Sequence, residues 1–406
     1  MNKEFEEDIR YASSITKLSE TELKVLKEAD AAAEELVMPE YEHYMNHEFN
    51  TEAIPVAKKH GLFGIPIPVE YGGLGLSPMV HSLVQMRLGQ LGLGFATLYD
   101  VQTFIAANII SRWGSDEQKL KHLKPMASGD SIFSFCLTEP EAGSDPNMMS
   151  TTYTKEGSGY VINGTKYLIT NGSICDHMIL FAKSKDGNGI TSFIINSKSE
   201  GFSVGTVLKE KIGLFTSDTA MLDFENVHVE KEDIIGTEGK GLHIAYSALL
   251  NGRLGIGSAC IGVIEASLSA SIKRAKERIQ HGKEIGKHQL IQQHISAMRQ
   301  NLEMARWPVL KAVLEKEAYD KNPDNEALLK NADINSALAK RIASRLAFES
   351  ADRAVQVHGG FGYSLMSPVG QLFLDSRVAR IYEGTDEIQD LKIASDVLGA
   401  GYSAYA

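Results

Sequence analysis

Cysteine is scarce in this sequence, and its spacing excludes two kinds of structural site. Only three cysteines occur in 406 residues, at Cys136, Cys175 and Cys260, and no two of them form a CxxC pair. This usage predicts buried free thiols, with neither a disulfide framework nor a zinc site. His43 and His47 stand four residues apart, but no third ligand lies at a suitable spacing, so we expect no metal.

Positive charge is also in short supply. The formal net charge is −11 and no lysine-rich cluster offsets it locally, so nucleic acid is not an expected partner. The N-terminal segment "MNKEFEEDIR" is acidic where a secretory signal would be basic and then apolar. No uninterrupted apolar run reaches the ~20 residues of a membrane span. We therefore expect a cytoplasmic protein without a membrane span.

Two common nucleotide-binding signatures are missing as well. No GxGxxG follows a strand and opens a helix, and no GxxxxGK(S/T) is present. The sequence therefore does not support a Rossmann or P-loop site.

The chain does contain two clear changes of pattern along its length. Residues 19–126 are typical of helices interrupted by Gly/Pro clusters, short β-branched and aromatic runs begin near residue 131, and helical periodicity returns after residue 238. We predict a mainly α protein with a β-domain. Its parts would be an N-terminal helical domain (1–130), a central β-domain (131–238) and a C-terminal helical bundle (239–406). With 43% hydrophobic residues, the chain is long enough for separate cores.

Local patterns within these domains give sharper expectations. Asn163-Gly164 is a strong hairpin signal, because a type I′ turn requires positive φ at both central residues. The segment 241–279 is apolar nearly all round, which is typical of a helix inside a bundle or subunit interface. Apolar residues spaced by three and four across 291–312 predict a packed helix that Pro308 bends locally. Residues 316–327 indicate a long polar loop.

Three segments carry glycines and polar side chains in patterns that suit a binding site. "FCLTEPEAGSD" (135–145) ends a strand in a loop of hydroxyls and backbone donors that could cradle a phosphate or a ring edge, or could be a plain turn. "GTKYLITNG" (164–172) brings Thr170 to a strand end, although by itself such a segment is most often a hairpin arm. The glycines of "QVHGGFGY" (356–363) permit close approach of another molecule, and a helix–helix turn would look similar.

A fourth segment, "RIYEGTDEIQ" (380–389), places three carboxylates within five positions, at Glu383, Asp386 and Glu387. Clustered carboxylates after a helix most often form a solvated face or an N-cap. Asp386 is expected to have such a role. Glu383 differs, because a tyrosine precedes it and a flexible glycine follows it.

In this order, the four segments resemble signatures of the acyl-CoA dehydrogenase family, together with "PVEYGGLG" (68–75), "DTAMLDFENVHV" (218–229) and "ERIQHGKEIGKHQ" (277–289). The resemblance covers nearly the whole chain. It implies an N-terminal helical domain, a central β-barrel-like domain and a C-terminal four-helix bundle, in a homotetramer. It also implies FAD as the cofactor and α,β-dehydrogenation of an acyl-CoA thioester in fatty acid metabolism.

By this resemblance, the residues that bind FAD come from several parts of the chain. One side of the flavin and its phosphates would contact Phe135, Leu137, Thr138 and Ser144. The other side, near the flavin N5 atom, would contact Leu168, Ile169 and Thr170, and many relatives carry a tryptophan in place of this leucine. Further contacts would come from Arg278, Gln280 and Gln289 of a neighbouring subunit, joined by Gln356, Gly360, Thr385 and Glu387.

The resemblance also assigns the chemistry to one carboxylate. Glu383 matches the family's base, which removes the proton next to the thioester carbonyl while a hydride leaves for flavin N5. Desolvation by substrate and flavin would raise the pKa of Glu383 toward neutrality. The backbone N–H of Glu383 would donate to the thioester carbonyl, and Gly384 would lie beside the substrate.

The carrier of the acyl group and the electron acceptor leave alternatives open. Arg253 matches an arginine that relatives use for coenzyme A, and Ser144 would meet the pantetheine. Leu250 and Ser395, however, stand where many relatives have an aspartate and an arginine, so an acyl carrier protein thioester is an alternative substrate. Electrons would pass to an electron-transfer flavoprotein, or to oxygen in a flavin oxidase. Glu383 disfavours a monooxygenase or nitroalkane-type oxidase, and an FAD-free scaffold is a third alternative.

Overall fold

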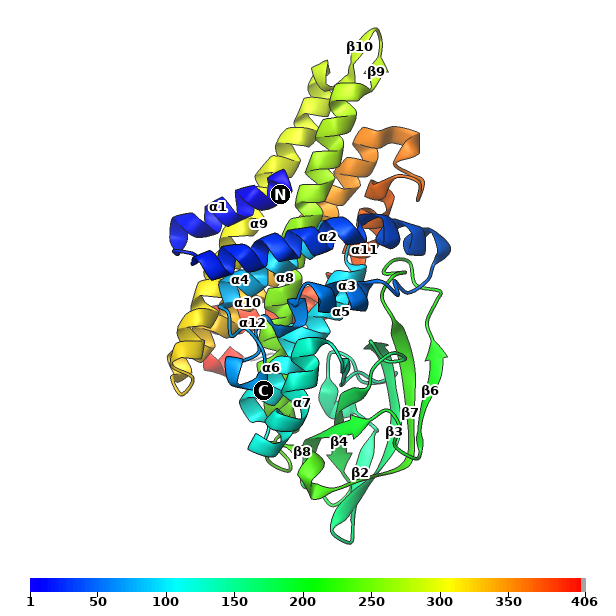
Figure 1. The fold of residues 1–406 in the computed structure, drawn as a ribbon, viewed down its shortest axis with the longest axis vertical. Helices are drawn as coiled ribbons and strands as arrows, with labels where there is room; N and C mark the ends of the chain where they lie inside the picture. The colour runs from blue at the N-terminus through cyan, green and yellow to red at the C-terminus, as the bar shows by residue number, and fades with distance from the viewer. Residues whose placement is uncertain (403–406) are drawn as a thin grey trace.

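A computed structural model describes residues 1–402 of the protein. Helices occupy both ends of the chain, and the sheet formed by the middle of the chain lies at one side of the helical body (Figure 1). The N-terminal elements are α1 (Lys3–Ile15), α2 (Glu20–Asn46), α3 (Ala53–Lys59), η1 (Leu62–Gly64), η2 (Val69–Tyr71), α4 (Pro78–Gly89), α5 (Gly94–Tyr99), the π-helical η3 (Asp100–Ala106), α6 (Ala107–Trp113) and α7 (Asp116–Ser128). Helix α1 lies ahead of the predicted helical start at residue 19, and its apolar face buries Phe5, Ile9 and Ala12.

The central part is an eight-stranded sheet. Its strands are β1 (Phe133–Cys136), β2 (Thr152–Glu156), β3 (Gly159–Thr170), β4 (His177–Ser184), β5 (Ile190–Asn196), β6 (Phe202–Val207), β7 (Thr219–Val229) and β8 (Ile234–Ile235), with the short helices η4 (Pro146–Met148) and η5 (Lys231–Asp233) between them. The spatial order is β6-β7-β3-β2-β4-β5-β8, and β1 pairs in parallel with β4. This order places the end of β1 close to β3, where two of the predicted binding loops meet.

The hairpin predicted at Asn163-Gly164 is wrong. Strand β3 continues through both residues, and the β2–β3 turn lies earlier, next to the Glu156/Gly159 pair. The ladder to β7 slips between Ile162 and Gly164, so the glycine serves a β-bulge. Gly164 has φ of 151°, and a Cβ there would overlap Thr151, which explains why the strand carries glycine at this point.

The C-terminal part is built on three long helices. Its elements are α8 (Gly241–Glu277), β9 (Ile279–Gln280), β10 (Lys283–Glu284), η6 (Ile285–Lys287), α9 (Gln289–Lys321), α10 (Glu326–His358), η7 (Gly359–Phe361), α11 (Pro368–Val378), α12 (Asp386–Leu398) and η8 (Ala400–Tyr402). Helix α10 packs against α8, α9, α11 and α12, which gives the expected bundle. The polar loop predicted at 316–327 is shorter, because α9 continues to Lys321 and α10 begins at Glu326.

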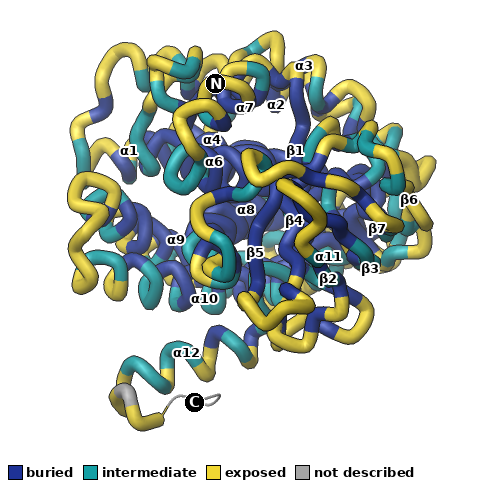
Figure 2. Tube along the Cα trace, turned by 90° about the horizontal axis from the view of Figure 1, so that it is seen from below, coloured by how far each residue is buried: buried dark blue, intermediate teal, exposed yellow. Residues whose placement is uncertain are grey.

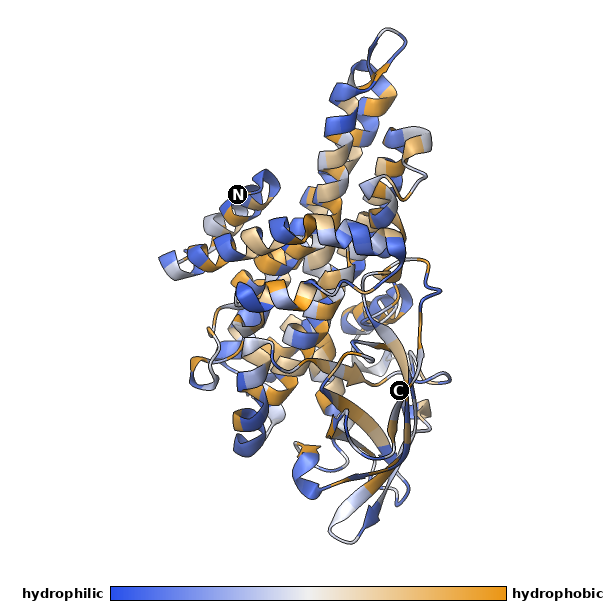
Figure 3. Cartoon of the chain, turned by 45° about the vertical axis from the view of Figure 1, so that its right-hand side comes forward, coloured by the Kyte–Doolittle hydropathy of each residue, from blue (hydrophilic) through white to orange (hydrophobic). Residues whose placement is uncertain are grey.

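Helix α8 is the central helix of the protein. It is apolar enough over its length to cross a membrane, with a mean hydropathy of 1.4 in its most apolar window, but 78% of that window is buried inside the protein. The dark blue tube of α8 runs through the middle of Figure 2, and the hydrophobic residues in Figure 3 lie mostly where helices face one another. The cysteines Cys136, Cys175 and Cys260 are free and buried, as predicted.

Candidate active site

The segment between α11 and α12 holds Glu383 in an unusual backbone conformation. Glu383 has φ of 55° and Gly384 has φ of 92°, so two successive residues lie in the left-handed region. Three side chains hold the carbonyls of this turn. Arg253 Nε donates to Glu383 O at 3.3 Å, Lys340 Nζ donates to Gly384 O at 2.7 Å, and Gln389 Nε2 donates to both oxygens. The strained turn is therefore fixed by α8, α10 and α12 together.

The carboxylate of Glu383 has one oxygen atom without a partner in residues 1–402. Its Oε2 atom is buried and has no hydrogen-bond partner among the described residues, although the residue as a whole is partly exposed. Burial raises the pKa of Glu383 to about 7, and the positive charges of Arg253 and Lys340 oppose that rise. Gly252 on α8 leaves the space that Oε2 occupies, because a Cβ there would overlap the oxygen.

The other two carboxylates of the segment differ from Glu383 in their surroundings, and the role of Glu387 in binding the cofactor stays a prediction. Asp386 is only 4% exposed, and it accepts from Arg380 Nε at 2.7 Å and faces Arg341 NH1 at 3.6 Å. The prediction that Asp386 is solvated or capping is therefore wrong, since its ion pairs tie the turn to α10. Glu387 is exposed in the first turn of α12, and the Thr385 hydroxyl caps that helix by accepting from Ile388 N at 3.3 Å.

A further carboxylate near Glu383 was missed by sequence reasoning. Asp100, at the start of η3, is 1% exposed and its Oδ1 has no hydrogen-bond partner in residues 1–402. A signal was present in the sequence, because Asp100 is the sole charged residue between Arg87 and Arg112. Without the fold, nothing in that pattern places it beside a segment almost 300 residues away.

The two loops predicted to bind a flavin lie side by side. Tyr167 N donates to Thr138 O at 2.9 Å, which joins the loop after β1 to the end of β3. The side-chain hydroxyls of Thr138, Ser144 and Thr170 make no hydrogen bond within the described part of the chain. Leu168 is 51% exposed and has φ of 57°, so its apolar side chain stands out from the sheet. Ile169 is buried at 2% and points into the sheet core.

A buried ion pair fixes the geometry of these loops. Lys166 Nζ donates to Glu139 Oε1 at 2.8 Å and to Leu137 O at 3.1 Å. Glu139 also accepts from Ser150 N and Thr151 N, so both oxygens of its carboxylate are hydrogen-bonded. Burial opposes ionisation of Glu139, but the Lys166 charge and these donors lower its pKa to about 2. Phe135 stays partly exposed and Leu137 is nearly buried on the same loop.

The remaining predicted cofactor residues lie at the other end of the molecule. Arg278 and Gln280 belong to the β9–β10 tip, and Gln289 begins α9 just behind it. Figure 1 shows this tip at the opposite end of the molecule from strands β2 and β4. Gln356 and Gly360 are exposed at the end of α10. One chain therefore does not bring both sets together, and the contact of the tip with a neighbouring subunit's cofactor stays a prediction.

These residues fit a flavin cofactor. Unbonded hydroxyls next to exposed apolar side chains suit a group with a flat ring, a polyhydroxyl chain and phosphates, and the sheet end offers both. The residues 1–402 contain no group of three His, Cys, Asp or Glu side chains that could hold a metal ion.

Helical domains before and after a β-domain, with a buried carboxylate in a strained turn, are accompanied by family matches that define the class of the protein, which is a flavoprotein oxidoreductase. The models of the acyl-CoA dehydrogenase N-terminal, middle and C-terminal domains match residues 19–130, 134–227 and 239–398. The chain belongs to the acyl-CoA dehydrogenase family.

Individual relatives agree over most of the chain. An acyl-CoA dehydrogenase of Bacillus subtilis is 37% identical over 87% of this chain and 91% of its own length. A short-chain-specific acyl-CoA dehydrogenase of Clostridium acetobutylicum is 36% identical over 86% of this chain and 90% of its own. The structure of butyryl-CoA dehydrogenase from Megasphaera elsdenii superimposes with a TM-score of 0.89 at 33% identity, covering 95% of this chain and all of that one.

Proposed function

We propose that this protein is an FAD-dependent acyl-CoA dehydrogenase in which Glu383 removes the proton from the carbon next to the thioester carbonyl. The observation that carries this assignment is the Glu383 carboxylate, which has a buried, unpartnered Oε2 and a pKa raised to about 7. A base with a pKa near neutrality is ionised at working pH and still accepts a proton strongly.

The turn that holds Glu383 also supplies a group for the substrate carbonyl. The backbone N–H of Glu383 donates no hydrogen bond within the described residues, whereas the two carbonyls of the turn are each held by side chains. An unpaired N–H next to the base is placed to donate to the thioester oxygen as negative charge develops on it. Arg253 and Lys340 fix the position of this N–H relative to the carboxylate, because they donate hydrogen bonds to the carbonyls of Glu383 and Gly384.

Thr138, Ser144 and Thr170 would bind FAD through their free hydroxyls, with Leu168 against the ring. When bound, FAD supplies the acceptor for the hydride that leaves the second carbon of the acyl chain. A relative from Bacillus anthracis, 31% identical to this chain, has been solved with FAD. Arg278, Gln280 and Gln289 would reach the cofactor of a second copy, in the homotetramer that we propose.

The acceptor of the electrons is proposed to be an electron-transfer flavoprotein. A subunit of the caffeyl-CoA reductase–Etf complex of Acetobacterium woodii is 38% identical over 86% of this chain and 90% of its own length. Its name places that relative in an assembly with such a partner.

An acyl carrier protein thioester remains the second candidate substrate. Arg253 is 5% exposed, and its NH1 pairs with Asp333 Oδ1 at 3.0 Å, so it is not available as a free phosphate ligand. Leu250 is buried against Tyr319, at the position where many relatives have a polar contact. A prolyl acyl carrier protein oxidase has a TM-score of 0.86 to this chain at 29% identity, covering 94% of it.

The test is anaerobic bleaching of the bound flavin by a panel of acyl thioesters, each offered on coenzyme A and on a carrier protein. We expect reduction by at least one thioester, and a Glu383→Gln variant that binds FAD equally but is slower by about 10²–10⁴-fold or more. Near-normal flavin reduction in that variant would refute the role of Glu383. A colourless protein that stays colourless with added FAD would favour the scaffold alternative.

A further inference from the structure

Asp100 lies beside the proposed base without a partner of its own. No hydrogen bond to either of its carboxyl oxygens occurs within residues 1–402, and Oδ1 is fully buried. On the facing helix α8, a Cβ at Gly252 would overlap Glu383 Oε2, and a Cβ at Gly255 would overlap Asp100 Oδ1. Glycines three residues apart therefore make room for two carboxyl groups on adjoining parts of one helix face.

Two negative charges on these adjacent buried carboxyl groups would be unfavourable. Burial and the neighbouring Glu383 carboxylate raise the pKa of Asp100 well above its usual range. Two carboxyls that share a desolvated site hold a proton between them, and the base must be the ionised member. Asp100 is then a neutral carboxylic acid, which offers one O–H donor and an acceptor oxygen.

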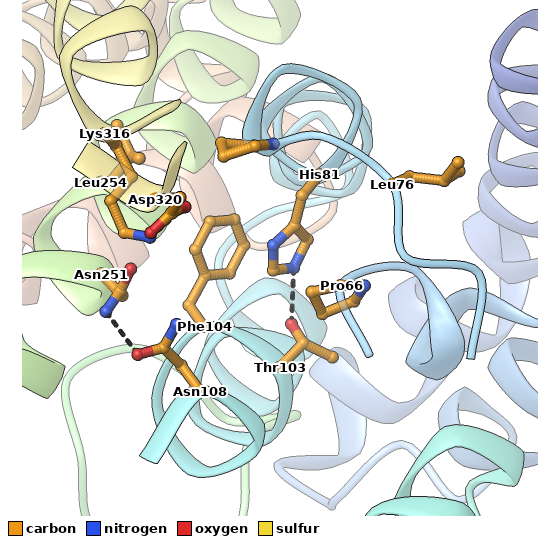
Figure 4. Close-up of a pocket in the computed structure, with 11 residues that line it drawn as sticks. Pro66, Leu76, His81, Thr103, Phe104, Asn108, Asn251, Leu254, Lys316 and Asp320 are labelled. Atoms are coloured by element: carbon orange, nitrogen blue, oxygen red, sulfur yellow. Dashed lines mark hydrogen bonds and ion pairs between the residues drawn. The ribbon is translucent and has the colours of Figure 1, made fainter. Parts of the chain in front are cut away.

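A cavity lies next to Phe104, whose side chain packs at the same glycine as Asp100. Phe104 touches the Gly255 position, as Asp100 does, and its other side lines a cavity of about 100 Å³ (Figure 4). Across this cavity His81 Nε2 and Thr103 Oγ1 are 2.8 Å apart, and Asn251 Nδ2 lies 3.0 Å from Asn108 Oδ1.

We propose that Asp100 is a specificity-determining residue that selects acyl groups with a hydroxyl on the fourth carbon, counted from the thioester carbonyl. This inference rests on the proposed function. Gly255 lies three positions after Gly252, which is a rise of about 4.5 Å along the helix. This rise is similar to the distance in the substrate between the carbon that faces Glu383 and a hydroxyl on the carbon two bonds further along the acyl chain. A hydroxyl can both accept from the neutral acid and donate to it.

Charged substituents fit this position less well. An ammonium group near Asp100 would lie equally near Glu383 and would lower its pKa, which weakens the base. A carboxylate would meet the Glu383 charge in a desolvated site, which is unfavourable. The neutral hydroxyl avoids both penalties.

The experiment compares three probes on the FAD-loaded enzyme under anaerobic conditions: butyryl-CoA, 4-hydroxybutyryl-CoA and 4-(trimethylammonio)butyryl-CoA. The wild type should reduce flavin with a kcat/KM about 10- to 100-fold higher for the hydroxylated thioester than for butyryl-CoA. Asp100→Ala should abolish this ratio, whereas Asp100→Asn, which keeps a donor and an acceptor, should retain most of it. Thr103→Val is the matched control, because it removes a hydroxyl from the same helix on the cavity side, and the ratio should persist.

The outcomes separate this inference from the function beneath it. If no thioester reduces the flavin, the proposed function fails. If butyryl-CoA reduces it and the hydroxyl brings no advantage, or Asp100→Ala keeps the advantage, the role of Asp100 alone is refuted. A preference for the trimethylammonium probe would also overturn it, in favour of a cation site. The wild-type ratio decides the matter even if the alanine variant does not fold.

Discussion

Replacing Gly252 by alanine should lower flavin reduction about 100-fold while leaving the helix intact. A Cβ at this position would overlap Glu383 Oε2, and Ile105 Cδ1 would lie 3.0 Å away, so the new methyl group has no free side to turn to. The carboxylate must therefore shift by roughly 1 Å, and a misplacement of that size can cost about 10²-fold in rate. The backbone itself stays unstrained, because Gly252 lies inside the regular helix α8.

Gly257→Ala, five residues along the same helix, is the matched control. A Cβ there would make ordinary contacts, 3.5 Å from Val309 Cγ2 and 3.6 Å from Lys340 N. Alanine is better than glycine inside a helix by about 1 kcal/mol, so this control should unfold at or above the wild-type temperature. Stopped-flow reduction of bound FAD by butyryl-CoA measures the rate, and the FAD-to-protein ratio checks cofactor binding. Wild-type rates in Gly252→Ala, or equal loss in both variants, would refute the argument.

Three further predictions concern charge. Because Glu383 must be ionised and its pKa is raised from 4.5 to about 7, kcat/KM should rise with pH up to about 7 and then level off. The effect on stability is opposite: the contribution of Glu383 to the free energy of unfolding is lost as pH rises through 7. A flat profile from pH 5 to 8 would contradict this. Arg278→Ala should weaken FAD retention, since a guanidinium on a diphosphate is a strong contact; a monomer by light scattering that holds stoichiometric FAD would count against the shared site. Lys166→Met should destabilise the protein by about 3–5 kcal/mol in urea unfolding, because Glu139 stays buried without its cation, and adding Glu139→Gln should recover part of the loss.

The order of the domains could be predicted from the sequence, because it depends on periodicities that act locally. The buried stripe of α9, with Met298, Leu302, Ala305 and Val309 all nearly inaccessible, follows directly from spacings of three and four. The hairpin at Asn163-Gly164 failed for the opposite reason. The same dipeptide suits a turn or a bulge. Here the bulge is decided by two tertiary contacts, which are the pairing of β3 with β7 and the close approach of Thr151 to Gly164.

The site shows the same division. Glu383 could be proposed as the base because its segment resembles a family signature, whereas the surroundings of Asp386 and Asp100 depend on partners from distant elements. Asp386 forms an ion pair with Arg341 of α10, and Asp100 lies near enough to Glu383 for their charges to interact. Neither contact can be read from the local sequence, because the partners are far apart along the chain. Tertiary contacts of this kind decide whether a carboxylate is paired, solvated or free to react.

The small residues of α8 serve the fold and the site by the same means. Near the middle of the helix, Gly262 lies so close to α4 that a Cβ would overlap Met86 O, and Gly89 of α4 meets Ala259 in the same way. About two to three turns earlier, Gly252 and Gly255 leave their space to carboxyl groups instead of to backbone. The apolar, glycine-rich pattern of 241–279 therefore has two physical causes, close helix packing and room for two acidic side chains. Larger residues at these glycines should therefore have different effects. A substitution near Gly262 should lower the stability of the protein, whereas one near Gly252 should lower the turnover rate.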